Sequence, residues 1–431
     1  MKRVFSFTFS VLLLSLFLSL HAFAGELKER LAQLKDVSRI EELTSEHYAE
    51  KYLLRITQPI DHKHPEAGAF TQRVVICHVG TDRPTVIVTE GYGGRYALSP
   101  RYQEELSKLL NANVVFVEHR YFLESTPEPA DWNYLTAENS AFDLHHITTT
   151  FRTLYPGKWI STGISKGGQT TLLYRAFFPG DVDFSVPYVA PLCRSVEDGR
   201  HEVFLRQVGT KAERKHIETF QLEILKRKET MTPLLDAFCR EKGLTFHLPI
   251  AEILDYCVLE YSFAFWQWGS QASDIPSPAS SDTILFHHLL DISGPDYFAT
   301  NQPNAAFFVQ AAKELGYYGY DTHPFRKYLT IQHAGGYLHQ LMLPPGAEET
   351  TFDPGLYQKV YHYLKDNDPK IIFIYGEFDP WSAAHAPVFK KKKNSHFFFQ
   401  PRGSHRARIS NMPEKTQEKI MKHICEWLAN P

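Results

Sequence analysis

The sequence predicts an α/β protein with a mostly parallel central sheet and an inserted, mainly helical segment. Apolar strand-like runs alternate with helical segments over residues 85–192, and the same alternation returns over residues 351–431. Between them, residues 193–350 contain long helical stretches without that alternation. The 431-residue chain is 43% apolar and 22% charged, which is enough apolar sequence to bury a large core.

The N-terminus has the pattern of a secretory signal peptide. Lys2 and Arg3 precede an apolar run over residues 4–20, and Ala22 and Ala24 form a small-x-small cleavage site. A membrane anchor is the alternative, but the run is barely long enough to cross a bilayer. We therefore expect a secreted or periplasmic protein, cut after Ala24, without a stable membrane anchor.

The first half of the sheet is predicted from short β-rich runs. Residues 52–60 alternate in polarity, residues 72–79 are rich in β-branched side chains, and residues 85–88 are continuously apolar. An amphipathic helix is predicted over residues 100–110. The run NVVFV at residues 113–117 then has the character of a strand that is covered on both faces, as in parallel sheets.

The later elements follow the same order. Apolar positions spaced as in a helix cover residues 136–154, residues 158–162 form a strand, a helix follows Ser165, and residues 184–189 form another strand. After residue 350 the predicted elements are a helix (355–364), a strand (370–375), a strand (395–400) and a helix (413–428). The expected organisation is a signal peptide (1–24), a first core part (25–192), a helical cap (193–350) and a second core part (351–431).

Ser165 lies in a motif that is typical of a catalytic nucleophile. The predicted strand 158–162 leads into GISKG at residues 163–167, and a helix follows. In a strand-turn-helix of this type the serine is held in a strained turn, and glycines on either side avoid a collision with it. The motif alone occurs by chance, but this context favours a nucleophile and an α/β-hydrolase fold.

An acid and a histidine follow in the order that this fold requires. The strand 370–375 ends just before Asp379, at the edge of the sheet where active sites gather. His405 follows the last strand. Glu377 is the competing acid, and His396, at the start of the last strand, is more typical of a structural residue.

The oxyanion that forms in acyl transfer needs backbone donors. The amide of Lys166, next after the nucleophile, is one expected donor. The other is expected from the glycine-rich segment EGYGG at residues 90–94, through Gly91 or Tyr92.

Composition excludes several other functions. The net charge of −3 gives no basis for binding nucleic acid, and no spacing typical of metal ligands occurs, so we expect no metal and no cofactor. Five cysteines allow at most two disulfides. Their pairing and the oligomeric state are left open; the cysteines are Cys77, Cys193, Cys239, Cys257 and Cys425.

Four motifs together resemble a known family. GISKGG, VTEGYGG, VEHRYF and GEFDPW are similar to those of the secreted prolyl tri- and tetrapeptidyl aminopeptidases, serine peptidases with a capped α/β-hydrolase core. These are distantly similar to lysosomal prolyl carboxypeptidase and dipeptidyl peptidase II. The resemblance implies that peptides are the substrates and that short peptides are released from a free N-terminus after proline. It implies Ser165 as nucleophile, Asp379 as acid and His405 as base.

Such an exopeptidase needs a carboxylate for the substrate ammonium group. Glu90, Glu118 and Glu124 are candidates near the core edge, and acidic residues of the cap are equally open. Phe265 and Trp266, in an aromatic cluster of the cap, could line a proline pocket, but such rings are more typical of the core of the cap itself. Arg120 is more typical of a structural ion pair.

Two other functions stay open at this stage. An esterase or lipase would use the same three residues, and a non-catalytic binding protein could be built on this fold. The ordered serine, acid and histidine favour an enzyme.

Overall fold

The computed structural model describes residues 26–429, so the predicted signal peptide lies outside the described residues. Within this range the chain forms a nine-stranded sheet with the order β1-β2-β3-β5-β4-β6-β7-β8-β9. The strands are β1 (Val37–Glu42), β2 (Glu50–Pro59), β3 (Ala69–His78), β4 (Thr85–Thr89), β5 (Asn113–Val117), β6 (Trp159–Ile164), β7 (Phe184–Tyr188), β8 (Ile371–Gly376) and β9 (Ser395–Gln400).

The strands from β4 onward are parallel to one another, whereas β1, β2 and β3 form an antiparallel extension that joins the sheet at β5. This mostly parallel sheet with flanking helices has the α/β-hydrolase fold, which confirms the predicted fold class. Two neighbouring parallel strands can be joined only by a crossover connection, and each crossover here passes over a face of the sheet.

Helices cover both faces of the sheet. On one face, α3 (Ala137–Arg152) packs its apolar residues against alternate residues of the central strands. On the other face, α2 (Glu105–Leu110) and α12 (Glu414–Ala429) cover the intervening residues. Every residue of β4 and β5 is buried as a result, which explains the continuous apolar runs in these strands.

Two expectations for the core differ from the structure. The helix predicted from residue 100 begins at Glu105, because the Glu104 carboxylate accepts a hydrogen bond from the Ser107 amide and caps the helix there. Strand β1 was not expected. Its sequence VSRIEE has few apolar residues, and all its side chains are exposed or half-buried because it lies at the sheet edge.

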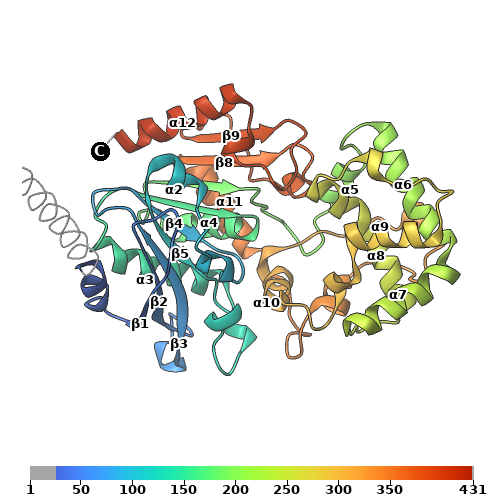
Figure 1. The fold of residues 1–431 in the computed structure, drawn as a ribbon, viewed down its shortest axis with the longest axis horizontal. Coiled ribbons are helices and arrows are strands. Elements are labelled where there is room, and N and C mark those ends of the chain that lie inside the picture. Colours follow the sequence, from blue (N-terminus) through green and yellow to red (C-terminus); the bar gives the residue numbers. More distant parts are fainter. Residues whose placement is uncertain (1–25, 430–431) are drawn as a thin grey trace, which may run out of the picture.

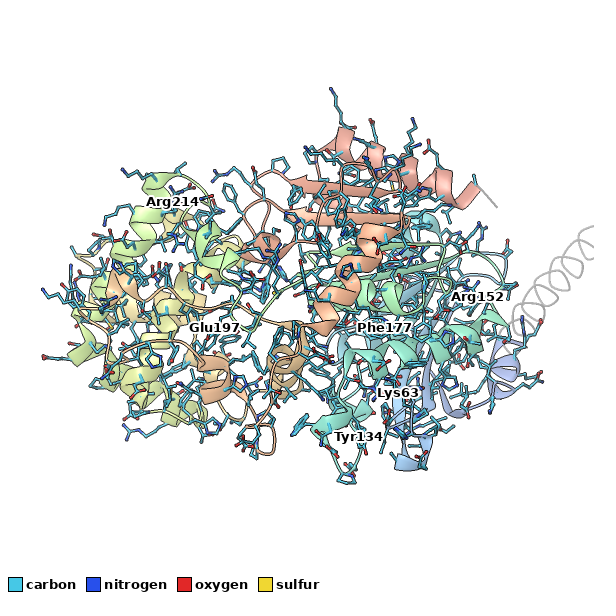
Figure 2. All side chains as sticks on the ribbon, turned by 180° about the vertical axis from the view of Figure 1, so that it is seen from behind. Lys63, Tyr134, Arg152, Phe177, Glu197 and Arg214 are labelled. Atoms are coloured by element: carbon cyan, nitrogen blue, oxygen red, sulfur yellow. The ribbon has the colours of Figure 1, made fainter. Side chains whose placement is uncertain are left out.

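The described chain between β7 and β8 contains helices and loops but no strand. Its main helices gather beside the sheet as a separate layer, while α11 returns to the core (Figure 1). Seen from behind, Glu197 and Arg214 lie in this cap and Arg152 and Phe177 lie in the core (Figure 2). The cap boundaries at residues 193 and 350 stay a prediction. The helices are α5 (Arg200–Leu205), α6 (Lys211–Lys226), α7 (Lys228–Lys242), α8 (Ile250–Trp268), α9 (Asp282–Ser293), α10 (Ala305–Gln310) and α11 (Gly355–Asp366).

Helix α8 is the centre of the cap. It contacts α6, α7 and α9, and most of its residues are buried. Both α5 and α8 also contact the turn Pro380–Ala384, which follows β8 in the core. The cap is therefore joined to the core directly beside the strand ends where Asp379 lies.

Candidate active site

Ser165 occupies a sharp turn between β6 and α4 (Lys166–Phe177). Its φ of 59° is in the left-handed region, and its amide donates a hydrogen bond to the Tyr188 carbonyl of β7 at 2.9 Å. A Cβ on Gly163 would lie 2.3 Å from the Gly167 carbonyl oxygen, so only glycine fits there. The backbone thus has the strained strand-to-helix turn that the GISKG motif predicts.

Asp379 and His405 are brought together by the ends of β8 and β9. His405 Nδ1 lies 2.7 Å from Asp379 Oδ2, and the other Asp379 oxygen accepts the Trp381 amide at 3.1 Å. Asp379 is fully buried. With Nδ1 donating to this carboxylate, Nε2 is left as an acceptor, and among the described residues it has no hydrogen-bond partner. A proton acceptor is therefore available in the pocket that Ser165 also lines.

Glu377 and His396, the alternatives to Asp379 and His405, have other partners. Glu377 is exposed, and its carboxylate accepts the Arg402 amide at 2.7 Å. His396 stacks on His423 of α12 with ring centroids 3.8 Å apart, at the opposite end of β9. Neither residue lines the pocket that contains Ser165 and His405.

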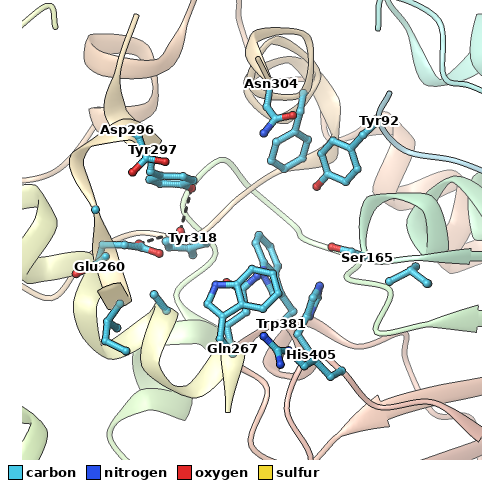
Figure 3. Close-up of a pocket in the computed structure, with 18 of the residues that line it drawn as sticks. Tyr92, Ser165, Glu260, Gln267, Asp296, Tyr297, Asn304, Tyr318, Trp381 and His405 are labelled. Carbon is cyan, nitrogen blue, oxygen red and sulfur yellow. Dashed lines mark hydrogen bonds between the residues drawn. The ribbon is translucent and has the colours of Figure 1, made fainter. Parts of the chain in front are cut away.

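One pocket of about 690 Å³ contains Ser165 and His405. Its core side also carries Tyr92, Trp381 and Glu90, and its cap side carries residues of α8 and of the segment that follows α9 (Figure 3). Aromatic rings line much of the space; they belong to Tyr92, Tyr96, Trp268, Tyr297, Phe307, Phe308, Tyr317, Tyr318 and Trp381. This volume is typical of a site for a small ligand or short peptide.

The segment EGYGG packs directly against the turn that contains Ser165. A Cβ on Gly91 would lie 2.5 Å from the Gly167 amide nitrogen, so the close approach requires glycine. However, the amides of Gly91 and Tyr92 both donate to the Glu90 carboxylate, at 3.1 and 3.2 Å. Both candidates for the second oxyanion donor are thus occupied by a neighbouring side chain in this structure.

The Tyr92 side chain provides a group that the sequence prediction missed. Its ring points into the pocket near Ser165 (Figure 3). Burial raises the pKa of the Tyr92 hydroxyl, and a hydrogen bond with the Ser165 side chain opposes that rise. The segment therefore presents a hydroxyl, and not only backbone amides, to the serine.

The Lys166 side chain is enclosed beneath this segment. Its Nζ lies 5.9 Å from the Tyr92 ring centroid and 5.4 Å from that of Phe122, and it has no hydrogen-bond partner among the described residues. Burial lowers the pKa of this amine to about 7, although the charges of Glu90 and Glu314 oppose the shift. Lys166 thus packs as a buried, weakly basic side chain against the ring whose hydroxyl reaches Ser165.

Several predicted substrate contacts are not in the pocket. Glu118 is fully buried, pairs with Arg73 at 2.9 Å and accepts the Gly94 amide at 2.8 Å, so it supports the loop from behind. Glu124 pairs with Arg73 at 2.7 Å and also with Arg55. Arg120 binds Asp143 through two nitrogens at 2.7 Å each, in the structural role expected for it.

Phe265 and Trp266, the candidates for lining a proline pocket, do not line the pocket of Ser165. Phe265 is buried within the cap, and Trp266 lines a second cavity of about 250 Å³. The residues of α8 that do face the pocket are Glu260, Ala264, Gln267 and Trp268. Their spacing of four, three and one residues is one face of a helix, and Phe265 and Trp266 point away from it. This periodicity was visible in the sequence, but the face that meets the core was not.

The described residues contain no metal site, no membrane-spanning helix and no disulfide. Among residues 26–429, no group of three histidine, cysteine, aspartate or glutamate side chains is arranged to hold a metal ion. No helix in that range is both long and apolar enough to cross a bilayer. None of the five cysteines is in a disulfide, and four of them are buried.

Comparison with known families identifies the chain. The model of the PS-10 peptidase S37 family matches residues 21–430. The chain belongs to the peptidase S37 family. This peptidase S37 protein is 29% identical over 422 residues to the prolyl tri/tetrapeptidyl aminopeptidase of Streptomyces mobaraensis, a match that covers 95% of this chain and 86% of the relative. The resemblance inferred from the four motifs is confirmed, and the peptidase S37 protein is a serine peptidase.

Solved structures show more distant similarity to this peptidase S37 protein. The proline iminopeptidase of Mycobacterium smegmatis has a TM-score of 0.40 at 12% identity, covering 87% of this chain and 98% of that one. The peroxisomal alpha-beta-hydrolase of Saccharomyces cerevisiae has a TM-score of 0.34 at 12% identity, covering 84% of each chain.

Proposed function

We propose that this serine peptidase is an exported exopeptidase that releases di- to tetrapeptides from free N-termini, with preference for proline on the acyl side of the cleaved bond. The observation that carries the proposal is that Ser165 and His405, which is paired with the buried Asp379, line one pocket with a wall of cap residues. A peptide chain end fits a pocket that is bounded by a cap better than an open surface groove. Export rests on the signal-peptide pattern of residues 1–24.

In the proposed mechanism His405 Nε2 takes the proton of Ser165 as its Oγ attacks the acyl carbon. Asp379 holds the imidazole in the required tautomer and stabilises the imidazolium that forms. His405 then gives the proton to the leaving amine. Water, deprotonated by the same histidine, releases the acyl group from Ser165 and restores the enzyme.

The proposed oxyanion donors are the Lys166 amide, which follows the nucleophile, and the segment that contains Gly91 and Tyr92. We include the Tyr92 hydroxyl as a further donor, which is supported by the position of its ring in the same pocket as Ser165. The amides of Gly91 and Tyr92 would have to exchange the Glu90 carboxylate for the oxyanion.

The preference for proline is supported by the rings beside the nucleophile. Trp381 contacts Tyr317 and Tyr318 with ring centroids 5.3 Å from each, and all three residues line the pocket. A flat pyrrolidine ring packs well on aromatic faces and loses little conformational entropy on binding.

The test is mass spectrometry of the products from a library of proline-containing peptides, with Ser165→Ala as the inactive control. We expect N-terminal peptides of two to four residues ending in proline. Internal cuts without dependence on the N-terminus would contradict the exopeptidase proposal. Turnover of a simple acyl ester but of no peptide would favour an esterase instead.

A further inference from the structure

Glu260 is a buried carboxylate of the cap that faces the same pocket as Ser165. It belongs to α8, and in the pocket it lies on the wall opposite the nucleophile (Figure 3). Only 5% of its surface is exposed. The sequence offered no reason to select it among the many acidic residues of the cap.

The hydrogen bonds of Glu260 leave half of its carboxylate unused. Tyr318 and Tyr320 both donate to Oε2, at 2.9 and 2.8 Å. Oε1 has no hydrogen-bond donor among the described residues, and no lysine, arginine or histidine of that part of the chain forms an ion pair with Glu260. A buried carboxylate in this situation lacks the positive partner that such groups ordinarily have.

A cation that enters through the pocket would supply the missing partner. Burial raises the pKa of the Glu260 carboxyl to about 8, with the two tyrosine hydrogen bonds opposing the rise. An ammonium group at Oε1 would favour the ionised form and offset the cost of burial. The α-amino group of a peptide is such a cation at neutral pH.

The charges around the pocket are arranged to orient a peptide. Asp291 and Asp296 line the same cap side as Glu260 and are exposed at its rim. Arg406 and Arg408 line the core side, next to His405. A peptide with its N-terminus toward the cap and its chain passing Ser165 matches this distribution.

We propose that Glu260 binds the α-ammonium group of the substrate through Oε1 and that its separation from Ser165 sets the length of the peptide released. This inference rests on the proposed exopeptidase function. The phenol groups of Tyr318 and Tyr320 fix the carboxylate, and the aromatic wall between Glu260 and Ser165 holds the residues of the released peptide.

Glu90 is the other carboxylate of the pocket, and its contacts make it a poorer candidate. It already accepts hydrogen bonds from the amides of Gly91 and Tyr92 and from the Tyr96 hydroxyl. It also belongs to the segment that packs against the turn of Ser165, so an ammonium group bound there would lie beside the scissile bond. Glu260, across the pocket, leaves room for several residues.

The test compares a proline-terminated peptide p-nitroanilide that has a free N-terminus with its N-acetylated form, at the length that the native enzyme cleaves best. We expect Glu260→Gln to lower kcat/KM for the free peptide by about 10- to 100-fold, the usual value of a charge-assisted hydrogen bond, and to leave the acetylated peptide nearly unchanged. Glu260→Asp retains the charge and should retain more of the preference for the free peptide. It should also change the preferred length.

Glu202→Gln is the matched control, because Glu202 is a half-buried cap carboxylate that lines the second cavity and not the pocket of Ser165. Labelling of Ser165 by a small fluorophosphonate verifies that each variant is folded. If folded Glu260→Gln retains the native ratio between the two peptides, the assignment of Glu260 is overturned while the exopeptidase function stands. If the native enzyme cleaves neither peptide, or both equally well, the exopeptidase function and the assignment fail together.

Discussion

The backbone amide of His405 donates a hydrogen bond to the carbonyl of Gln267 at the C-terminal end of α8, at 2.9 Å. The Trp268 ring meets the His405 ring edge-on, with centroids 6.1 Å apart. A cap helix therefore helps to hold the loop of the proposed base. Because the same helix carries Glu260, its position affects both ends of the pocket at once.

The end of α8 offers a test of this support. Gly269 terminates the helix at a φ of +76°, and a Cβ there would lie 3.1 Å from Ser404, the neighbour of His405. We expect Gly269→Ala to lower kcat by about 10-fold or more through displacement of the histidine loop, since small misplacements of catalytic groups are costly.

Gly243→Ala is the control for that prediction. Gly243 ends α7 with a φ of +65°, and a Cβ added there would meet no side chain or distant backbone atom within 4 Å. Both variants carry the same kind of backbone strain, about 1 kcal/mol, and only Gly269→Ala adds the collision. Equal kcat values in the two variants, measured with peptide p-nitroanilide, would contradict the proposed support of His405.

The choice of acid can be decided with two carboxylates that lie two residues apart. Asp379→Asn keeps the shape of the side chain but favours the wrong imidazole tautomer, so we expect kcat to fall by about 10⁴-fold. Glu377→Gln, at an exposed position, should remain within about threefold of the native rate, as is usual for surface substitutions. Steady-state kinetics on both variants checks the assignment, and the reverse order of effects would make Glu377 the acid.

The Tyr92 hydroxyl can be removed without loss of the ring. If it donates to the oxyanion, Tyr92→Phe should lower kcat by about 10²- to 10³-fold with little change in KM. The ring contacts with Phe122 and Phe307 would persist in this variant, so its thermal unfolding serves as the control. An unchanged kcat would limit Tyr92 to a packing role.

Lys166 should make stability depend on pH. Its folded-state pKa of about 7 is below the ordinary lysine value of 10.5, so between these pH values the unfolded chain binds more protons than the folded protein. The free energy of unfolding therefore rises with pH over this window, and the cost of burying the charge is fully present below pH 7.

Replacement of Lys166 by a neutral side chain of similar length should remove that cost. We expect Lys166→Met to stabilise the protein by about 1–4 kcal/mol at about pH 6 and to flatten the rise between about pH 7 and 10. Denaturant unfolding at several pH values measures both effects. A variant that is less stable than the native protein in mild acid would show that the amine has a partner that offsets its burial.

The fold and the three proposed catalytic residues could be predicted because the patterns that indicate them lie in short, continuous stretches of sequence. Ser165, Asp379 and His405 each follow an apolar strand, and parallel strands bring their carboxyl ends to one edge. Glu260 could not be predicted, because its role depends on which face of α8 meets the core. The same reason explains why the sequence left two positions open for Phe265 and Trp266, whose aromatic character suits a pocket and a cap interior equally well.

The position of the cap in the chain between β7 and β8 has a consequence for synthesis. A nascent chain acquires Ser165 early, but Asp379 and His405 emerge only with the last two strands, after the whole cap. A prematurely terminated product therefore carries the serine without the proposed acid and base. The sheet also cannot add β8 beside β7 until the intervening helices are made, so proteolytic activity would first arise at the very end of translation and folding.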